Sequence, residues 1–152
     1  MNKDRADSAA FSELSHELLA SGIDFRFHAN GRSMMPTIQD GEILQVRSTT
    51  RERPIVGDII LFRKDGRLRA HRIVRRSKGF FLTRGDSGVD PDGIVSREQI
   101  IGKVLAKECR RTGRLVPLSG TVARITFFWR ESKRLLRRSE TSLATERQGV
   151  SD

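Results

Sequence analysis

The sequence predicts a mainly β fold, an antiparallel β-barrel or sandwich with an N-terminal helix and a C-terminal basic amphipathic helix. Short apolar segments with a two-residue period recur between residues 23 and 118. Turn signals separate these segments about every ten residues, a spacing typical of all-β domains. The segments before and after this region have helical spacing instead. The 152 residues suit one such domain with additional terminal segments.

The N-terminal helix is predicted over residues 8–21. Phe11, Leu14, Leu18 and Leu19 recur at the spacing of one helical face, which gives an apolar stripe. Ser8 is a suitable N-cap and Gly22 a suitable stop. We therefore expect residues 1–22 to form a helical segment that packs on the β-rich region.

The predicted strands lie between Gly-, Asn- and Asp-containing turns. Phe25 and Phe27 alternate with polar residues, as in a half-buried strand. Asp65-Gly66 suits the positive φ angles of a tight hairpin. Residues 85–96 are rich in Gly, Asp, Pro and Ser, which predicts a loop. The remaining strands are expected at residues 42–47, 59–62, 68–75, 80–83, 99–107 and 115–116.

Residues 119–138 are predicted to form a basic amphipathic helix. Val122, Ile125, Trp129 and Leu136 share one face, and six Arg and Lys residues occupy the rest. Residues 103–152 carry 12 basic and 5 acidic residues, whereas residues 1–102 carry 17 and 14, so most of the net charge of +10 is C-terminal. Such a patch attracts phospholipid head groups, nucleic acid or an acidic partner. The polar residues 139–152 are predicted to be a disordered tail.

The composition excludes several classes of protein. A single cysteine, Cys109, rules out a disulfide framework and a Cys-rich zinc site. Three scattered histidines show no ligand spacing, so no metal or cofactor is implied. No apolar stretch reaches the roughly 18–20 residues of a membrane span, and the first residues lack the apolar core of a secretion signal. We therefore expect a cytoplasmic or peripheral membrane protein.

A candidate nucleophile, Ser33, lies in the sequence Gly31-Arg32-Ser33-Met34-Met35-Pro36. A serine hydroxyl needs a neighbouring base to act as a nucleophile. His16 falls in the predicted N-terminal helix and His28 is predicted to point outward from its strand, whereas His71 lies in a strand just after a hairpin. Taken locally, Ser33 is an ordinary loop residue and His71 an ordinary strand-edge residue.

The order of four sequence blocks gives these residues a context. Ser33-Met34-Met35-Pro36 resembles the Ser-x-x-Pro nucleophile box of the signal peptidase family, in its broad sense including the self-cleaving SOS repressors. Gly57-Asp58 and the apolar residues after it resemble the family's Gly-Asp strand, and His71-Arg72-Ile73-Val74 resembles its base-bearing strand. Gly85-Asp86 resembles its Gly-Asp box. The resemblance covers about residues 23–108 and implies a peptidase domain of the signal-peptidase type over residues 23–118.

The resemblance implies a catalytic role for each matching residue. The base position holds His71, as in the branch that uses histidine instead of lysine, and Lys64 is expected to be exposed in the hairpin turn. An aspartate is expected to orient His71, with Asp86 as first choice and Asp92 as second, although both also suit ordinary loop capping. Met34, Met35 and Pro36 are expected to line a substrate groove. Gly31 stands where leader peptidases often have a serine, so the oxyanion would be bound by backbone N–H groups.

The sequence therefore predicts a serine endopeptidase that cleaves a peptide or preprotein with a Ser33/His71 dyad. The alternative is a self-cleaving repressor-like protein, or an inactive peptidase fold that serves as a regulatory or binding module. The first 30 residues hold too little for a helix-turn-helix, and no motif for specific nucleic-acid binding is present. Residues 121–138 are either a peripheral membrane contact or a helix packed on the β domain. The oligomeric state is left open by the sequence.

Overall fold

The computed structural model describes residues 24–49, 53–120 and 125–129, together with Glu17, Ser21, Gly22 and Ser132. Within this part of the chain, the fold is a single antiparallel sheet of eight strands with one short 3-10 helix, as the sequence predicts. The elements are β1 (Phe25–His28), β2 (Ile43–Ser48), β3 (Ile59–Lys64), β4 (Arg67–Ser77), β5 (Phe80–Arg84), β6 (Gly93–Ser96), η1 (Arg97–Gln99), β7 (Ile100–Glu108) and β8 (Leu115–Pro117).

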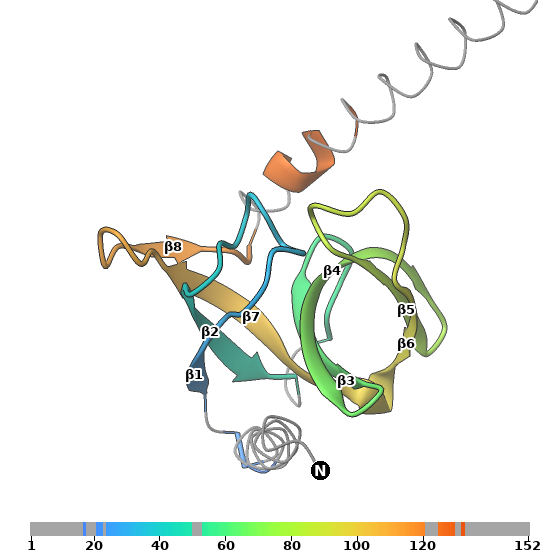
Figure 1. Cartoon of the computed structure of the whole chain (residues 1–152). Helices are drawn as coiled ribbons and strands as arrows, with labels where there is room; N and C mark the ends of the chain where they lie inside the picture. Colours follow the sequence, from blue (N-terminus) through green and yellow to red (C-terminus); the bar gives the residue numbers. More distant parts are fainter. Residues whose placement is uncertain are drawn as a thin grey trace, which may run out of the picture.

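The strands follow the order β1-β2-β7-β3-β4-β5-β6, and β8 pairs with β7 beyond the end of β3. The sheet curls strongly, so that β3 to β6 curve around one side of the molecule and β1, β2, β7 and β8 form the other (Figure 1). The long strand β7 joins the two halves, because it pairs with β2 along one edge and with β3 along the other. The mainly β fold class is therefore confirmed.

Two apolar clusters lie on opposite faces of β3. Ile59 and Leu61 belong to one cluster with residues of β2 and β7, whereas Ile60 and Phe62 belong to the other with residues of β4, β5 and β6. All four side chains are buried, because successive residues of a strand point to opposite faces and both faces are covered here. The continuous apolar run Ile59–Phe62 therefore reflects a central strand.

The β3–β4 hairpin forms where the sequence predicts it. Asp65 and Gly66 have φ angles of 53° and 70°, as expected for a two-residue turn between paired strands. The prediction of one loop over residues 85–96 was wrong at its end, because Gly93–Ser96 forms β6 and pairs with β5. Only Val95 of this strand is buried. A four-residue strand with one core side chain gives too weak a pattern to recognise from sequence.

The predicted terminal segments lie largely outside the described residues. This holds for the N-terminal helix over residues 1–22, of which Glu17, Ser21 and Gly22 are described, and for the tail over residues 139–152. Within residues 119–138, residues 125–129 are helical, whereas Ser119 and Gly120 precede the helix as a bend. Gly120 has a φ of 95°, which a helix does not allow. The helices of the described residues include none long and apolar enough to cross a membrane.

Candidate active site

Ser33 lies on the segment that connects β1 to β2. Backbone hydrogen bonds between Ala29 and the Gly41–Glu42 pair close this segment at its base, and the N–H of Gly31 donates to Asp40 Oδ1 at 2.7 Å. Met34 is buried beneath the turn, at 5% exposure, whereas Ser33 itself is exposed. The segment thus fixes its backbone through the core and presents the serine hydroxyl at the surface.

His71 lies on β4, opposite Ile60 of β3, and is buried at 6% exposure. Its Nε2 is 2.9 Å from Ser33 Oγ, and its Nδ1 is 2.6 Å from Asp92 Oδ2. A carboxylate accepts hydrogen bonds and cannot donate them, so the proton of a neutral imidazole belongs on Nδ1. The Nε2 lone pair then faces the serine hydroxyl, which is the arrangement a general base requires.

The main chain of Asp92 is held from two sides. Its N–H donates to the carbonyl of Thr83 at 2.8 Å, and its own carbonyl accepts a hydrogen bond from Lys64 Nζ at 3.1 Å. The prediction that Lys64 is exposed in the hairpin turn was wrong, because Lys64 is the last residue of β3 and is half-buried. Its ammonium group contacts the carbonyl of Asp92, and the side chain next to the serine hydroxyl is that of His71.

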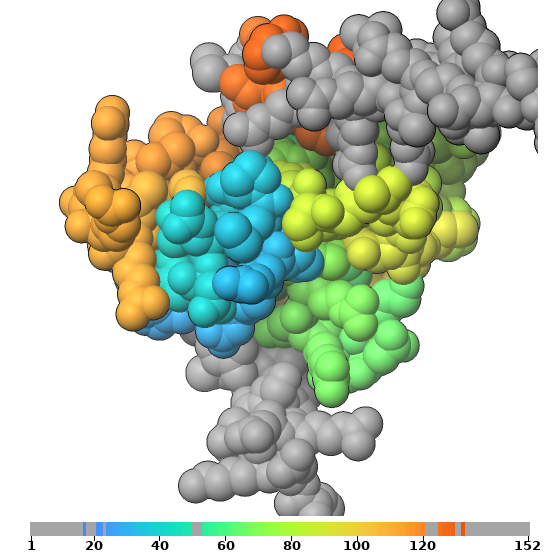
Figure 2. Space-filling model, turned by 45° about the horizontal axis from the view of Figure 1, so that its top comes forward, coloured from blue at the N-terminus to red at the C-terminus, as the bar shows by residue number. Residues whose placement is uncertain are grey.

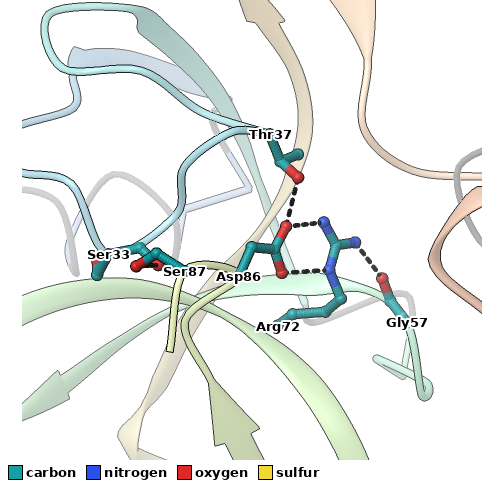
Figure 3. Close-up of polar contacts among 6 residues, drawn as sticks. All are labelled: Ser33, Thr37, Gly57, Arg72, Asp86 and Ser87. Carbon is teal, nitrogen blue, oxygen red and sulfur yellow. Dashed lines mark hydrogen bonds and ion pairs between the residues drawn. The ribbon is translucent and has the colours of Figure 1, made fainter. Parts of the chain in front are cut away.

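The carboxylate of Asp86, in the loop after β5, lies on the face of β4 opposite to that of His71. It binds the Arg72 guanidinium in a bidentate manner, at 2.9 Å from Nε and 2.6 Å from Nη2, and accepts a hydrogen bond from Thr37 Oγ1 (Figure 3). Arg72 Nη1 also donates to the carbonyl of Gly57 at 2.8 Å. The expected preference for Asp86 as the partner of His71 is therefore corrected to Asp92. His71 and Arg72 are consecutive, so their side chains point to opposite faces and each has its own aspartate.

The loop that carries Asp86 also holds the backbone of the serine. The N–H and the hydroxyl of Ser87 both donate to the carbonyl of Ser33, at 3.0 and 2.9 Å. Gly85 lies so close beneath this carbonyl that a Cβ added to it would be 2.5 Å from the oxygen. The backbones can approach this closely only because residue 85 has no side chain. Figure 3 shows Ser33 and Ser87 side by side, next to the Asp86–Arg72 pair.

Ser33 and His71 are among the residues that line a groove of about 1090 Å³. One wall is formed by β1 and the nucleophile turn, and the other by the β3–β4 hairpin with residues 65–70. Its floor is apolar, with the buried side chains of Met34, Ile38, Leu44 and Leu61. Of the three residues expected to bind substrate, Met34 lines this groove. Met35 and Pro36 are exposed and do not line it, so their role in binding stays a prediction.

The comparison with protein families agrees with this geometry. A model of the family described as peptidase S24-like matches residues 4–105, which include Ser33, His71, Asp86 and Asp92. The chain belongs to the peptidase S24-like family. A search of curated proteins found no match. This S24-like chain therefore has a serine-peptidase type of fold, and the sequence resemblance to the signal peptidase and SOS-repressor group is confirmed.

Sequence reasoning missed several residues of this S24-like site. Arg72 was read as part of the base-bearing strand, although a charged residue beside His71 in a buried strand was a signal that an acidic partner lies nearby. Thr37 and Ser87 gave no such signal, because hydroxyl residues are common in loops. Gly85 was recognised as part of a motif, but the close approach that requires a glycine there is visible only in three dimensions.

Proposed function

We propose that this S24-like domain is an active serine endopeptidase that resembles signal peptidase I and cleaves a peptide or preprotein. The observation that carries the proposal is the line of three side chains, Ser33, His71 and Asp92, with distances of 2.9 and 2.6 Å between their polar atoms. A nucleophile, a base and a carboxylate in this order are the arrangement of a serine hydrolase. The Asp92 contact completes the Ser33/His71 dyad expected from sequence.

The catalytic steps follow from these three residues. Ser33 Oγ attacks the carbonyl carbon of the scissile bond while His71 Nε2 takes the hydroxyl proton. The tetrahedral intermediate collapses, His71 gives the proton to the leaving amine, and an acyl ester remains on Ser33. Water then attacks the ester, with His71 again as the base, and releases the acid product. Asp92 keeps the Nδ1 proton in place and stabilises the imidazolium formed in each half-reaction.

The backbone N–H of Ser33 is the donor best placed to form a hydrogen bond with the oxyanion of the tetrahedral intermediate. No described residue accepts a hydrogen bond from this N–H, so it is available to a substrate. The N–H of Gly31 is already engaged by Asp40, so it is not a free donor. Ser87 and Gly85 fix the peptide unit that follows Ser33, which limits movement of the serine itself. A preorganised donor of this kind stabilises developing charge without reorganisation.

The groove suits a substrate in extended conformation. β1 is the terminal strand of the sheet order, and β4 pairs with β5 only from Arg72 onward. Residues 67–70 of β4 can therefore offer main-chain groups to an added strand. The apolar floor favours uncharged side chains on the substrate near Ser33. The family resemblance implies small residues at the cleaved bond.

Cleavage of a peptide panel tests this proposal. The protein is incubated with peptides in which a hydrophobic segment ends in Ala-x-Ala, and products are identified by mass spectrometry across a pH series. We expect cleavage that falls at acid pH, because a protonated His71 cannot act as a base. Ser33→Ala and His71→Ala should each lose about 10³-fold or more in rate, whereas Ser77→Ala, at the far end of β4, should match the wild type.

Other outcomes separate the alternatives. Cleavage of the chain itself at a rate independent of protein concentration would indicate the self-cleaving, repressor-like alternative. Full activity of His71→Ala would indicate a different base and contradict the assigned role. The absence of any cleavage by the wild type, with the fold intact by circular dichroism, would contradict an active endopeptidase and favour a binding module.

A further inference from the structure

The described part of the C-terminal helix, residues 125–129, has one buried and several exposed apolar side chains. Phe127 is 8% exposed, and the Arg72 guanidinium lies over its ring at 5.1 Å from the centroid. Ile125, Phe128 and Trp129 are 62%, 51% and 61% exposed. Phe127 thus fixes this helical segment to the β domain, while its three large apolar neighbours face outward. We call these three residues the exposed apolar set.

This helical segment packs on the Asp86–Arg72 pair. Phe127 covers Arg72, which binds Asp86 on the face of β4 opposite to that of His71. In Figure 1 the orange segment lies at the same end of the molecule as the segment that carries Ser33 and the loop that joins β5 to β6. Figure 2, turned to bring that end forward, shows the three side by side. Two further exposed apolar residues, Met35 and Val89, belong to this nucleophile segment and this loop.

Charge indicates what covers the exposed apolar set. Residues 121–138 contain six Arg and Lys residues and a single acidic one, Glu131. Large exposed apolar side chains, a tryptophan among them, within a strongly basic sequence are typical of a segment that lies in the interface of an anionic bilayer. A nucleic acid would use the positive charges but would leave Ile125 and Phe128 in water. A protein partner would also bury these aromatic side chains, so the vesicle titration below includes it as an outcome.

We propose that Ile125, Phe128 and Trp129 form a membrane-docking surface that inserts into the head-group region of an anionic lipid bilayer. The apolar side chains supply burial, and the basic residues of the sequence 121–138 supply attraction to the anionic lipids. Docking would place the segment that carries Ser33 and the loop that joins β5 to β6 close to the bilayer surface, because both lie at the same end of the molecule as residues 125–129 (Figure 1). The proposal does not depend on catalysis, because it concerns binding alone.

The single tryptophan of the chain, Trp129, makes the test direct. The full-length protein is titrated with vesicles of phosphatidylglycerol and phosphatidylcholine, and with vesicles of phosphatidylcholine alone, at several salt concentrations. With the anionic vesicles we expect a blue shift of the tryptophan emission and sedimentation of the protein with the lipid. Both effects should weaken with salt and be much smaller with neutral vesicles, because the basic residues provide the initial attraction.

A matched pair of variants assigns the effect to the exposed apolar set. Ile125→Ser with Phe128→Ser keeps Trp129 as the probe and should weaken vesicle binding by about tenfold or more. Phe80→Ser with Ile94→Ser is the control, because these residues are similarly exposed, at 52% and 63%, and belong to β5 and β6 instead of the helical segment. Equal losses in the two double variants would overturn the assignment.

Two further outcomes would overturn the proposal itself. The first is the absence of a blue shift and of co-sedimentation with anionic vesicles, which would leave the surface to a protein partner. The second is equally tight binding to DNA or RNA and to vesicles, with no blue shift in either case. Such binding would reflect charge alone, without insertion of apolar side chains.

Discussion

The two ends of the segment between β5 and β6 contribute to the site in different ways. At the first end, Gly85, Asp86 and Ser87 hold the backbone around Ser33 through a close approach, an ion pair to Arg72 and two hydrogen bonds. At the second end, Asp92 contacts the imidazole of His71 and none of these groups. One loop therefore positions the nucleophile through the main chain and the base through a side chain.

This difference means that two aspartates six positions apart should fail in different ways. In the proposed mechanism the Asp92 carboxylate acts in the chemical step, so its loss should affect the rate far more than the stability. Loss of the Asp86 carboxylate leaves the buried charge of the Arg72 guanidinium without its partner, so it should affect stability first. The expected loss of rate decreases from substitution of Asp92 to substitution of Lys64.

The largest effect is expected for Asp92→Asn. An asparagine cannot hold the Nδ1 proton of His71 as a carboxylate does, so kcat should fall by about 10²–10⁴-fold. KM and the melting temperature should change little. Peptide cleavage kinetics and thermal unfolding measure these quantities, with Asp90→Asn in the same loop as the control. A loss of kcat below tenfold would show that Asp92 does not orient the base.

Asp86→Asn should be the most destabilising change. Asp86 and Arg72 have side-chain exposures of 13% and 6%, and the substitution leaves the Arg72 charge without a carboxylate. The free energy of unfolding should fall by about 3 kcal/mol, as when one partner of a buried pair is removed. The rate should also fall, by about tenfold or more, because the backbone around Ser33 is held less firmly. Urea denaturation measures the first effect, and an unchanged midpoint would contradict the assigned role.

Gly85→Ala tests the close approach to the nucleophile. The new Cβ would be 2.5 Å from the carbonyl oxygen of Ser33, so the nucleophile turn must shift. We expect a stability loss of about 1–3 kcal/mol and a fall in kcat that is larger than the change in KM. Gly88→Ala is the matched control, because its Cβ would meet its nearest atom at 3.4 Å and no positive φ is required. Equal losses of stability and of kcat in Gly85→Ala and Gly88→Ala would show that the site does not require the close approach at Gly85.

The smallest effect is expected for Lys64→Met. This change keeps the side-chain stem but removes the hydrogen bond to the carbonyl of Asp92. One such bond contributes about 0.5–1.5 kcal/mol, so kcat should fall only a few-fold. Lys64→Arg should recover part of the loss. Complete loss of activity in Lys64→Met, comparable to that in His71→Ala, would indicate that the lysine is the base.

The fold was largely predictable because its signals are local. The alternation of Phe25 and Phe27, the Asp65-Gly66 turn and the apolar run Ile59–Phe62 each follow from side-chain chemistry within a few residues. β6 was missed because its four residues become a strand only through pairing with β5, which is a non-local contact. The order of strands in the curled sheet also depends on contacts between residues far apart in the sequence.

The site was predictable in its residue types and only partly in its pairings. Ser33 and His71 were found because motif order carries information across the chain, and the structure brings them within hydrogen-bond distance. The choice between Asp86 and Asp92 depends on which face of β4 each end of a loop reaches. The path of the loop depends on the pairing of β5 with β6 and on the ion pair with Arg72. No short-range sequence pattern predicts either contact.

In the proposed mechanism Ser33 is a nucleophile that His71 and Asp92 activate. Labelling with a fluorophosphonate tests it most directly, because the reagent requires an activated serine and no knowledge of the natural substrate. We predict one label on the wild-type protein, mapped to Ser33 by peptide mass spectrometry and absent in Ser33→Ala. Labelling should be at least about tenfold slower in His71→Ala and in Asp92→Asn. A wild-type protein that stays unlabelled, or a His71→Ala variant that labels at the wild-type rate, would contradict the account.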